Sequence, residues 1–221
     1  MYMQSAYSKT NKPSIMKVLK VLAIVLVVLI GLYVVFAAVS PSELYIEKIE
    51  TINAPASAVM ANVVCLDKWP AWSAWQKMDT AMKNEYSDDP CGAGAWNSWD
   101  GPNSGKGKQT IEQVNGEESI KMNLVFEGFD GINYANWTFE EADGVTTVTW
   151  TFEGAPSPFM MRPMNLMMKG VLEESYQTGL AALKVVTEAN PMIETGYSIY
   201  RIDIPAFGAL LISGDVKSQE I

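Results

Sequence analysis

The sequence predicts an α+β fold in which a curved antiparallel sheet wraps around one long C-terminal helix, preceded by one transmembrane helix. Three observations support it. Residues 21–39 form an uncharged apolar segment. Short segments of alternating polarity, separated by turn residues, fill residues 83–153, and short connections of this kind join antiparallel strands. An apolar stripe then recurs at every third or fourth position through residues 159–188, as in an amphipathic helix.

The apolar segment 21–39 has the length of a membrane span. As a helix it covers roughly 28 Å, close to the ~30 Å hydrocarbon core of a bilayer. Four lysines precede it and glutamates follow it, so the positive-inside rule predicts a cytoplasmic tail over residues 1–20 and a domain on the extracytoplasmic, periplasmic side. A cleaved signal peptide and a buried core helix are the alternatives, although a signal peptide's apolar region is usually shorter.

Charge and composition restrict the partners and the chemistry. The chain carries a net charge of −9 and contains no histidine. An acidic domain argues against nucleic acid as a partner, because nucleic acid attracts positive patches. The lack of histidine excludes Ser–His–Asp and Cys–His catalysis and removes the commonest metal ligand.

Cys65 and Cys91 are the two cysteines of the chain. They could pair in an oxidising compartment, but their spacing does not reveal whether their backbones approach each other. Two separate thiols are the favoured interpretation. Two cysteines without histidine do not suggest zinc, so we predict no metal and no cofactor.

The elements follow from periodicity and breakers. Residues 44–52 alternate as a strand, and Pro55 marks the start of a short helix over residues 56–66. An aromatic run, Trp69–Trp75, comes next. Six further strands are expected at residues 83–87, 95–100, 107–114, 119–127, 132–140 and 145–153, before the long helix at 159–188.

Several motifs in this order resemble the START-like superfamily (SRPBCC, or Bet v 1-like), which has the helix-grip fold, and within it the bacterial polyketide cyclase/dehydrase-type branch. They are INAP at 52–55, WPAWSAW at 69–75, FEG at 126–128, WTFEG at 150–154, PFMMRPM at 158–164 and GLAALK at 179–184. The resemblance covers residues 43–188 and implies a cavity between sheet and long helix. It further implies that the partner is a hydrophobic small molecule or a lipid.

The tail, residues 189–221, carries a second and weaker resemblance. Its segments YRIDIPA at 200–206 and LLISG at 210–214 are similar to the opening strand and turn of a GyrI-like effector-binding domain. The tail is too short to bury a core of its own. We therefore expect a truncated GyrI-like domain or a tail that pairs elsewhere.

Alternation within the strands indicates which side chains would line the implied cavity. Apolar residues on one face of two strands, methionines of the long helix and two tryptophans of the aromatic run are the candidates, and methionine suits adaptable binding surfaces. The same side chains could instead pack as a closed core, with the tryptophans as a plug. The candidate ligand-binding residues are Trp72, Trp75, Met122, Leu124, Phe126, Trp150, Phe152, Met161, Met164 and Met168.

No catalytic residues are predicted. Glu127 and Glu153 end their strands on the parity opposite to the apolar positions, which favours the solvent face. Arg162 could hold an anionic group or cap a helix end. Non-catalytic, membrane-anchored ligand binding is therefore the leading hypothesis, and a polyketide cyclase/dehydratase-like enzyme or a sensor module are the alternatives.

Overall fold

The computed structural model describes residues 15–190, and its elements confirm the predicted fold class. Residues 1–14 and 191–221 lie outside the described residues, so the predictions for the cytoplasmic tail and for most of the tail at 189–221 stay predictions. The elements are α1 (Ile15–Val39), β1 (Tyr45–Ile52), α2 (Ala56–Val63), η1 (Leu66–Ala71), α3 (Ala74–Met78), β2 (Lys83–Tyr86), β3 (Trp96–Gly101), β4 (Gly105–Asn115), β5 (Ser119–Phe126), β6 (Asn133–Ala142), β7 (Val145–Glu153), η2 (Phe159–Met161) and α4 (Arg162–Ala189).

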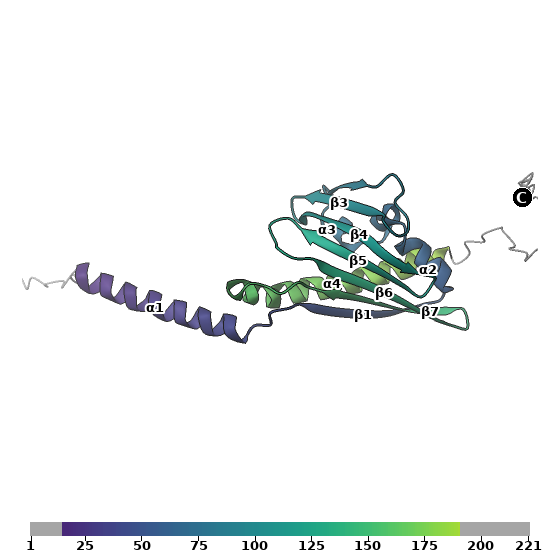
Figure 1. Cartoon of the computed structure of the whole chain (residues 1–221). Coiled ribbons are helices and arrows are strands. Elements are labelled where there is room, and N and C mark those ends of the chain that lie inside the picture. The colour runs from purple at the N-terminus through teal and green to yellow at the C-terminus, as the bar shows by residue number, and fades with distance from the viewer. Residues whose placement is uncertain (1–14, 191–221) are drawn as a thin grey trace, which may run out of the picture.

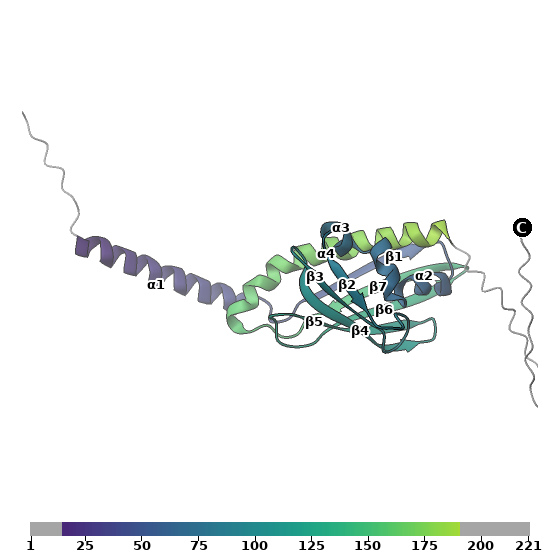
Figure 2. The same ribbon diagram turned by 90° about the horizontal axis from the view of Figure 1, so that it is seen from above.

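The seven strands form one antiparallel sheet in the order β1-β7-β6-β5-β4-β3-β2. From β2 to β7, each strand pairs with the next strand along the chain. β1 pairs with β7 and forms the edge of the sheet opposite β2. The sheet curves, and α4 lies along its concave face (Figures 1 and 2). A register shift between Ile111 and Gln113 interrupts the pairing of β4 with β5, and such bulges increase local bending.

Helix α1 begins six residues before the predicted span, at Ile15, and projects away from the sheet in both views (Figures 1 and 2). Ala37 is its one buried residue, so a buried core helix is excluded. Within residues 15–190 it is the one helix long and apolar enough to cross a membrane, a property that signal sequences share. The Tyr33 hydroxyl donates a hydrogen bond to the Met160 carbonyl, which joins α1 to η2.

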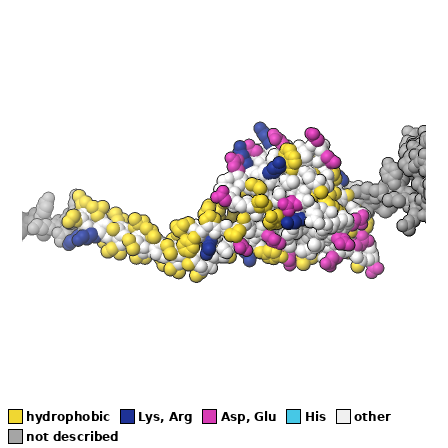
Figure 3. All heavy atoms as spheres, viewed as in Figure 1, with side chains coloured by type: hydrophobic (Ala, Val, Ile, Leu, Met, Phe, Trp, Pro, Cys, Tyr) yellow, Lys and Arg dark blue, Asp and Glu magenta, His cyan; other side chains and the backbone are white. Residues whose placement is uncertain are grey.

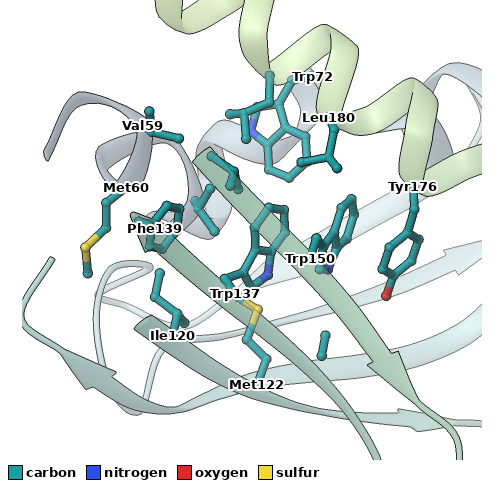
Figure 4. Close-up of a cluster of buried hydrophobic side chains, with 14 of the residues drawn as sticks. Val59, Met60, Trp72, Ile120, Met122, Trp137, Phe139, Trp150, Tyr176 and Leu180 are labelled. Atoms are coloured by element: carbon teal, nitrogen blue, oxygen red, sulfur yellow. The ribbon is translucent and has the colours of Figure 1, made fainter. Parts of the chain in front are cut away.

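A stack of aromatic rings connects α4 to the middle of the sheet (Figure 4). Trp137 and Trp150 are cross-strand partners with ring centroids 4.2 Å apart, and Tyr176 of α4 stacks on Trp150 at 3.8 Å. Trp72 meets both tryptophans edge-on, at 5.9 and 6.0 Å. Gly179 permits this approach, because a Cβ there would lie 3.2 Å from the Trp150 ring. Trp72 therefore acts as the plug, as one interpretation of the aromatic run expected.

Cys65 and Cys91 are joined in a disulfide, so the interpretation as two separate thiols is wrong. Their Cα atoms are 4.1 Å apart. Backbone hydrogen bonds on both sides of the pair, from Leu66 N to the Pro90 carbonyl and from Gly92 N to the Val64 carbonyl, hold the two segments together. A separation of 26 residues along the chain carries no information about such tertiary pairing.

Removing this disulfide should destabilise the domain. It closes a loop of 26 residues, and loop-closure entropy predicts a loss of about 3.5 kcal/mol in the free energy of unfolding. Chemical denaturation of the full chain in detergent, followed by tryptophan fluorescence, would compare wild type with the Cys65→Ala/Cys91→Ala variant. The reduced wild type should match that variant. Identical unfolding midpoints for all three samples would contradict the pairing.

Candidate functional site

A cavity of about 440 Å³ lies between the concave face of the sheet and the N-terminal half of α4. Ligand pockets typically measure about 300–1,000 Å³, so this space can hold a small organic molecule. The aromatic stack separates it from the filled core, because Trp150 and Tyr176 belong to both the stack and the cavity wall. The C-terminal half of α4 is sealed against the sheet by fully buried Leu180 and Leu183.

The cavity brings together most of the predicted binding residues. Its wall contains eight of them: Trp75, Leu124, Phe126, Trp150, Phe152, Met161, Met164 and Met168.

Trp72 and Met122 do not line the cavity, which corrects their expected position. Both are completely buried in the closed core. Trp72 covers the stack, and Met122 sits in a filled cross-strand row between Ile111 and Ala135 (Figure 4). Alternation identifies the inward face of a strand but not which part of that face other side chains cover.

The mouth of the cavity is apolar and adjoins α1. Exposed Phe129, Met161, Met164, Met168 and Val171 contribute to its rim. Two polar residues of the wall tie it to the segment after α1. Asn165 donates to the Pro41 carbonyl at 2.9 Å, and the Ser157 N–H donates to the Ser42 carbonyl at 2.7 Å. This part of the wall therefore lies at the end of the domain where α1 joins.

Sequence reasoning missed a polar region in the wall formed by β3 and β4. Asn97 and Gln109 are cross-strand partners, both nearly buried, and both line the cavity. The strand alternation could have revealed them, because residues two apart in a strand face the same side. Asn97 is two residues from inward-facing Trp99, and Gln109 is two residues from inward-facing Ile111. Polarity alone predicts the solvent face for such residues, which is why the pattern of apolar residues does not reveal them.

Asp79, directly after α3, is the most constrained polar group of the wall. Its Oδ2 accepts hydrogen bonds from the backbone N–H groups of Asn103 and Ser104, both at 2.9 Å, and from the Ser104 hydroxyl at 2.8 Å. Burial opposes ionisation, but these hydrogen bonds outweigh it and lower the pKa of the carboxyl. Gly101 leaves room for the carboxylate, because a Cβ at that position would collide with Oδ2.

The described part of the wall contains two carboxylates, Asp79 and Asp130, and no lysine or arginine. Glu127 and Glu153 are exposed and lie outside it. Arg162 also lies outside the wall, with its guanidinium 5.5 Å from the Phe159 ring centroid. Burial strongly raises the pKa of the Tyr176 hydroxyl, which keeps this cavity residue neutral.

One group of three side chains within residues 15–190 has the proximity of metal ligands, namely Cys65, Asp67 and Cys91. Its two sulfurs are bonded to each other, so they are not available as thiolate ligands.

The lowered pKa of Asp79 predicts an acid-sensitive fold. Because the folded-state pKa lies below the unfolded one, the stabilisation is present at neutral pH and is lost as the pH falls below about 4. Thermal unfolding followed by circular dichroism at pH 6 and pH 3.5 should show a smaller loss of Tm for Asp79→Asn than for wild type. Asp130→Asn, in an exposed loop, serves as the matched control. An equal pH response in wild type and Asp79→Asn would refute the assignment.

A family model described as "Polyketide cyclase / dehydrase and lipid transport" matches residues 46–188 of the chain. The match begins in β1 and ends near the end of α4, so it includes the sheet, the stack and the cavity. No curated protein matches the chain.

Solved structures share the fold at low sequence identity. Protein MLL2253 from Mesorhizobium loti is 12% identical, with a TM-score of 0.51, over 67% of this chain and 99% of that one. The protein XoxI from Bacillus cereus is 11% identical, with a TM-score of 0.50, over 65% of this chain and 95% of that one. At this identity the likeness concerns the fold alone.

Proposed function

Since the chain belongs to the polyketide cyclase / dehydrase and lipid transport family, we propose that it binds a hydrophobic small molecule or a lipid in its cavity, without changing it chemically. The cavity of about 440 Å³ is the observation that carries the proposal. Its wall combines aromatic rings, aliphatic side chains and flexible methionines, which can adapt to an apolar guest. Burial of apolar area, at about 25 cal/mol per Å², would supply the driving force.

Partly filling the cavity should weaken binding. Leu172 is half-buried, belongs to α4 and lines the cavity, so Leu172→Trp would occupy part of the space. Titration of the full chain with the neutral fluorescent probe N-phenyl-1-naphthylamine should give a Kd at least about tenfold higher for this variant, the effect of losing about 1.4 kcal/mol.

Val185→Trp is the matched control, because Val185 is an exposed residue of the same helix outside the cavity wall. It should leave the Kd unchanged. Equal affinities for wild type, Leu172→Trp and Val185→Trp would place the probe elsewhere and contradict the proposal.

A cyclase- or dehydratase-like reaction is the second candidate. The family's description and the position of Asp79 in the wall favour it, because a carboxylate can act as a general base. The lowered pKa of Asp79 makes this carboxylate a weak base, which counts against the reaction. A catalytic role predicts that Asp79→Asn loses turnover but still binds the substrate with wild-type affinity. A binding role predicts that the same variant alters affinity alone.

We further propose that α1 anchors the chain in a membrane, with the domain on the extracytoplasmic side. Lys17 and Lys20 lie at the N-terminal end of α1 and Glu43 follows it, in agreement with the positive-inside rule. A disulfide is typical of oxidising compartments.

Apolar side chains cover α1 and continue onto the adjoining end of the domain (Figure 3), where Leu166 and Met167 of α4 are exposed. A mouth beside this surface would receive an apolar ligand from the bilayer.

Protease treatment of spheroplasts from a bacterial expression host tests this orientation. An extracytoplasmic domain should be degraded without lysis, and the protein should remain in the membrane after carbonate extraction. A cytoplasmic domain would be protected until lysis. Release of the whole domain by carbonate would instead indicate a cleaved signal sequence.

A further inference from the structure

We infer that the cavity selects an amphiphile whose polar head donates hydrogen bonds, an alcohol or an amine, and discriminates against carboxylates. This inference rests on the proposed binding function and specifies the chemical class of its ligand. It is carried by unpaired acceptor atoms in the β3–β4 side of the wall and by the absence of cationic side chains from the described part of that wall.

Two acceptor atoms of wall residues are almost fully covered and have no hydrogen-bond partner of normal geometry among the described residues. They are Oδ1 of Asp79 and Oδ1 of Asn97, in side chains that are 1% and 7% exposed. An unpaired buried acceptor costs free energy, and the cost is larger when the group is charged. A ligand that donates a hydrogen bond to either oxygen would remove that cost. A purely hydrocarbon ligand would leave it in place.

The Asp79 carboxylate is held in position whether or not a ligand is present. Its other oxygen, Oδ2, already accepts three hydrogen bonds from the β3–β4 connection. The position of the carboxylate is therefore fixed, and the Ala81 N–H adds to the stabilisation of its ionised form. Oδ1 itself has almost no accessible surface, so neighbouring atoms of the wall must shift slightly before a donor reaches it.

The charges of the wall exclude the opposite class of head group. A carboxylate or phosphate head would meet Asp79 with no described lysine or arginine in the wall to neutralise it. The indole N–H of Trp150 is also buried and unpaired, so it offers one donor. A hydroxyl group fits both kinds of partner, because it donates one hydrogen bond and accepts others.

The apolar part of the ligand would lie against α4. Met161, Met164 and Met168 come from η2 and α4, whereas Asn97 and Gln109 come from the sheet. The cavity therefore has a polar region in one wall and an apolar opposite wall. This asymmetry matches an amphiphile and not a symmetric hydrocarbon.

Four probes with the same chain length test the inference. They are dodecane, 1-dodecanol, dodecylamine and dodecanoate, each added at the same mole fraction to the full chain in phosphatidylcholine nanodiscs. Changes in tryptophan fluorescence give Kd, because Trp75, Trp99 and Trp150 line the cavity. We expect dodecanol and dodecylamine to bind at least about tenfold more tightly than dodecanoate, since hydrogen bonds to charged groups contribute more than neutral ones.

Asn97→Leu removes one unpaired acceptor and keeps the side chain's approximate volume. It should fold at least as stably as wild type and should lower the preference for dodecanol over dodecane. Asp79→Asn should remove the preference for dodecylamine over dodecanoate, with folding checked by circular dichroism. Val185, an exposed residue of α4 outside the cavity wall, gives the control Val185→Leu, which should preserve the order of affinities.

The outcomes separate this inference from the proposed function. If dodecanoate binds as tightly as dodecanol, or if Asn97→Leu and Asp79→Asn leave the order unchanged, the inference is wrong while ligand binding stands. If none of the four probes binds, the proposed function itself fails.

Discussion

The stack of Trp137, Trp150 and Tyr176 is the contact on which the remaining architecture depends. It fixes α4 at the middle of the curved sheet, with Trp72 closing it from one side. The concave space on one side of the stack is filled, as the complete burial of Leu180 and Leu183 indicates. On the other side the helix does not seal the sheet, and the cavity remains. One aromatic cluster therefore separates the stabilising core from the candidate site.

The strand and helix pattern was predictable because each element carries its own periodicity. Residues 145–153 were predicted with the bounds that β7 has. The predicted helix at 159–188 differs from the structure only at its ends, because residues 159–161 form η2 and α4 continues to Ala189. Tertiary proximity was not predictable in this way. The pairing of Cys65 with Cys91 and the enclosure of Met122 depend on segments far apart in the sequence. The polar residues of the wall had the right parity, but their polarity argued against an inward position.

The site and the helix α1 occupy the same end of the molecule. Hydrogen bonds from Tyr33, Ser157 and Asn165 connect the α1 region to η2 and to the cavity wall. Under the proposed membrane anchoring, an apolar ligand would pass from the bilayer to the cavity over a short apolar surface. Under the proposed selectivity, the Asp79 carboxylate would then discriminate among such ligands by their head groups.

Native mass spectrometry of the full chain, released gently from membranes, tests the central claim that the space beyond the stack holds an amphipathic guest. We expect a species heavier than the chain by one small molecule, and collisional release should yield a neutral or cationic amphiphile. A chain that carries no such molecule from any membrane source, and takes up none on incubation with lipid extract, would contradict the claim.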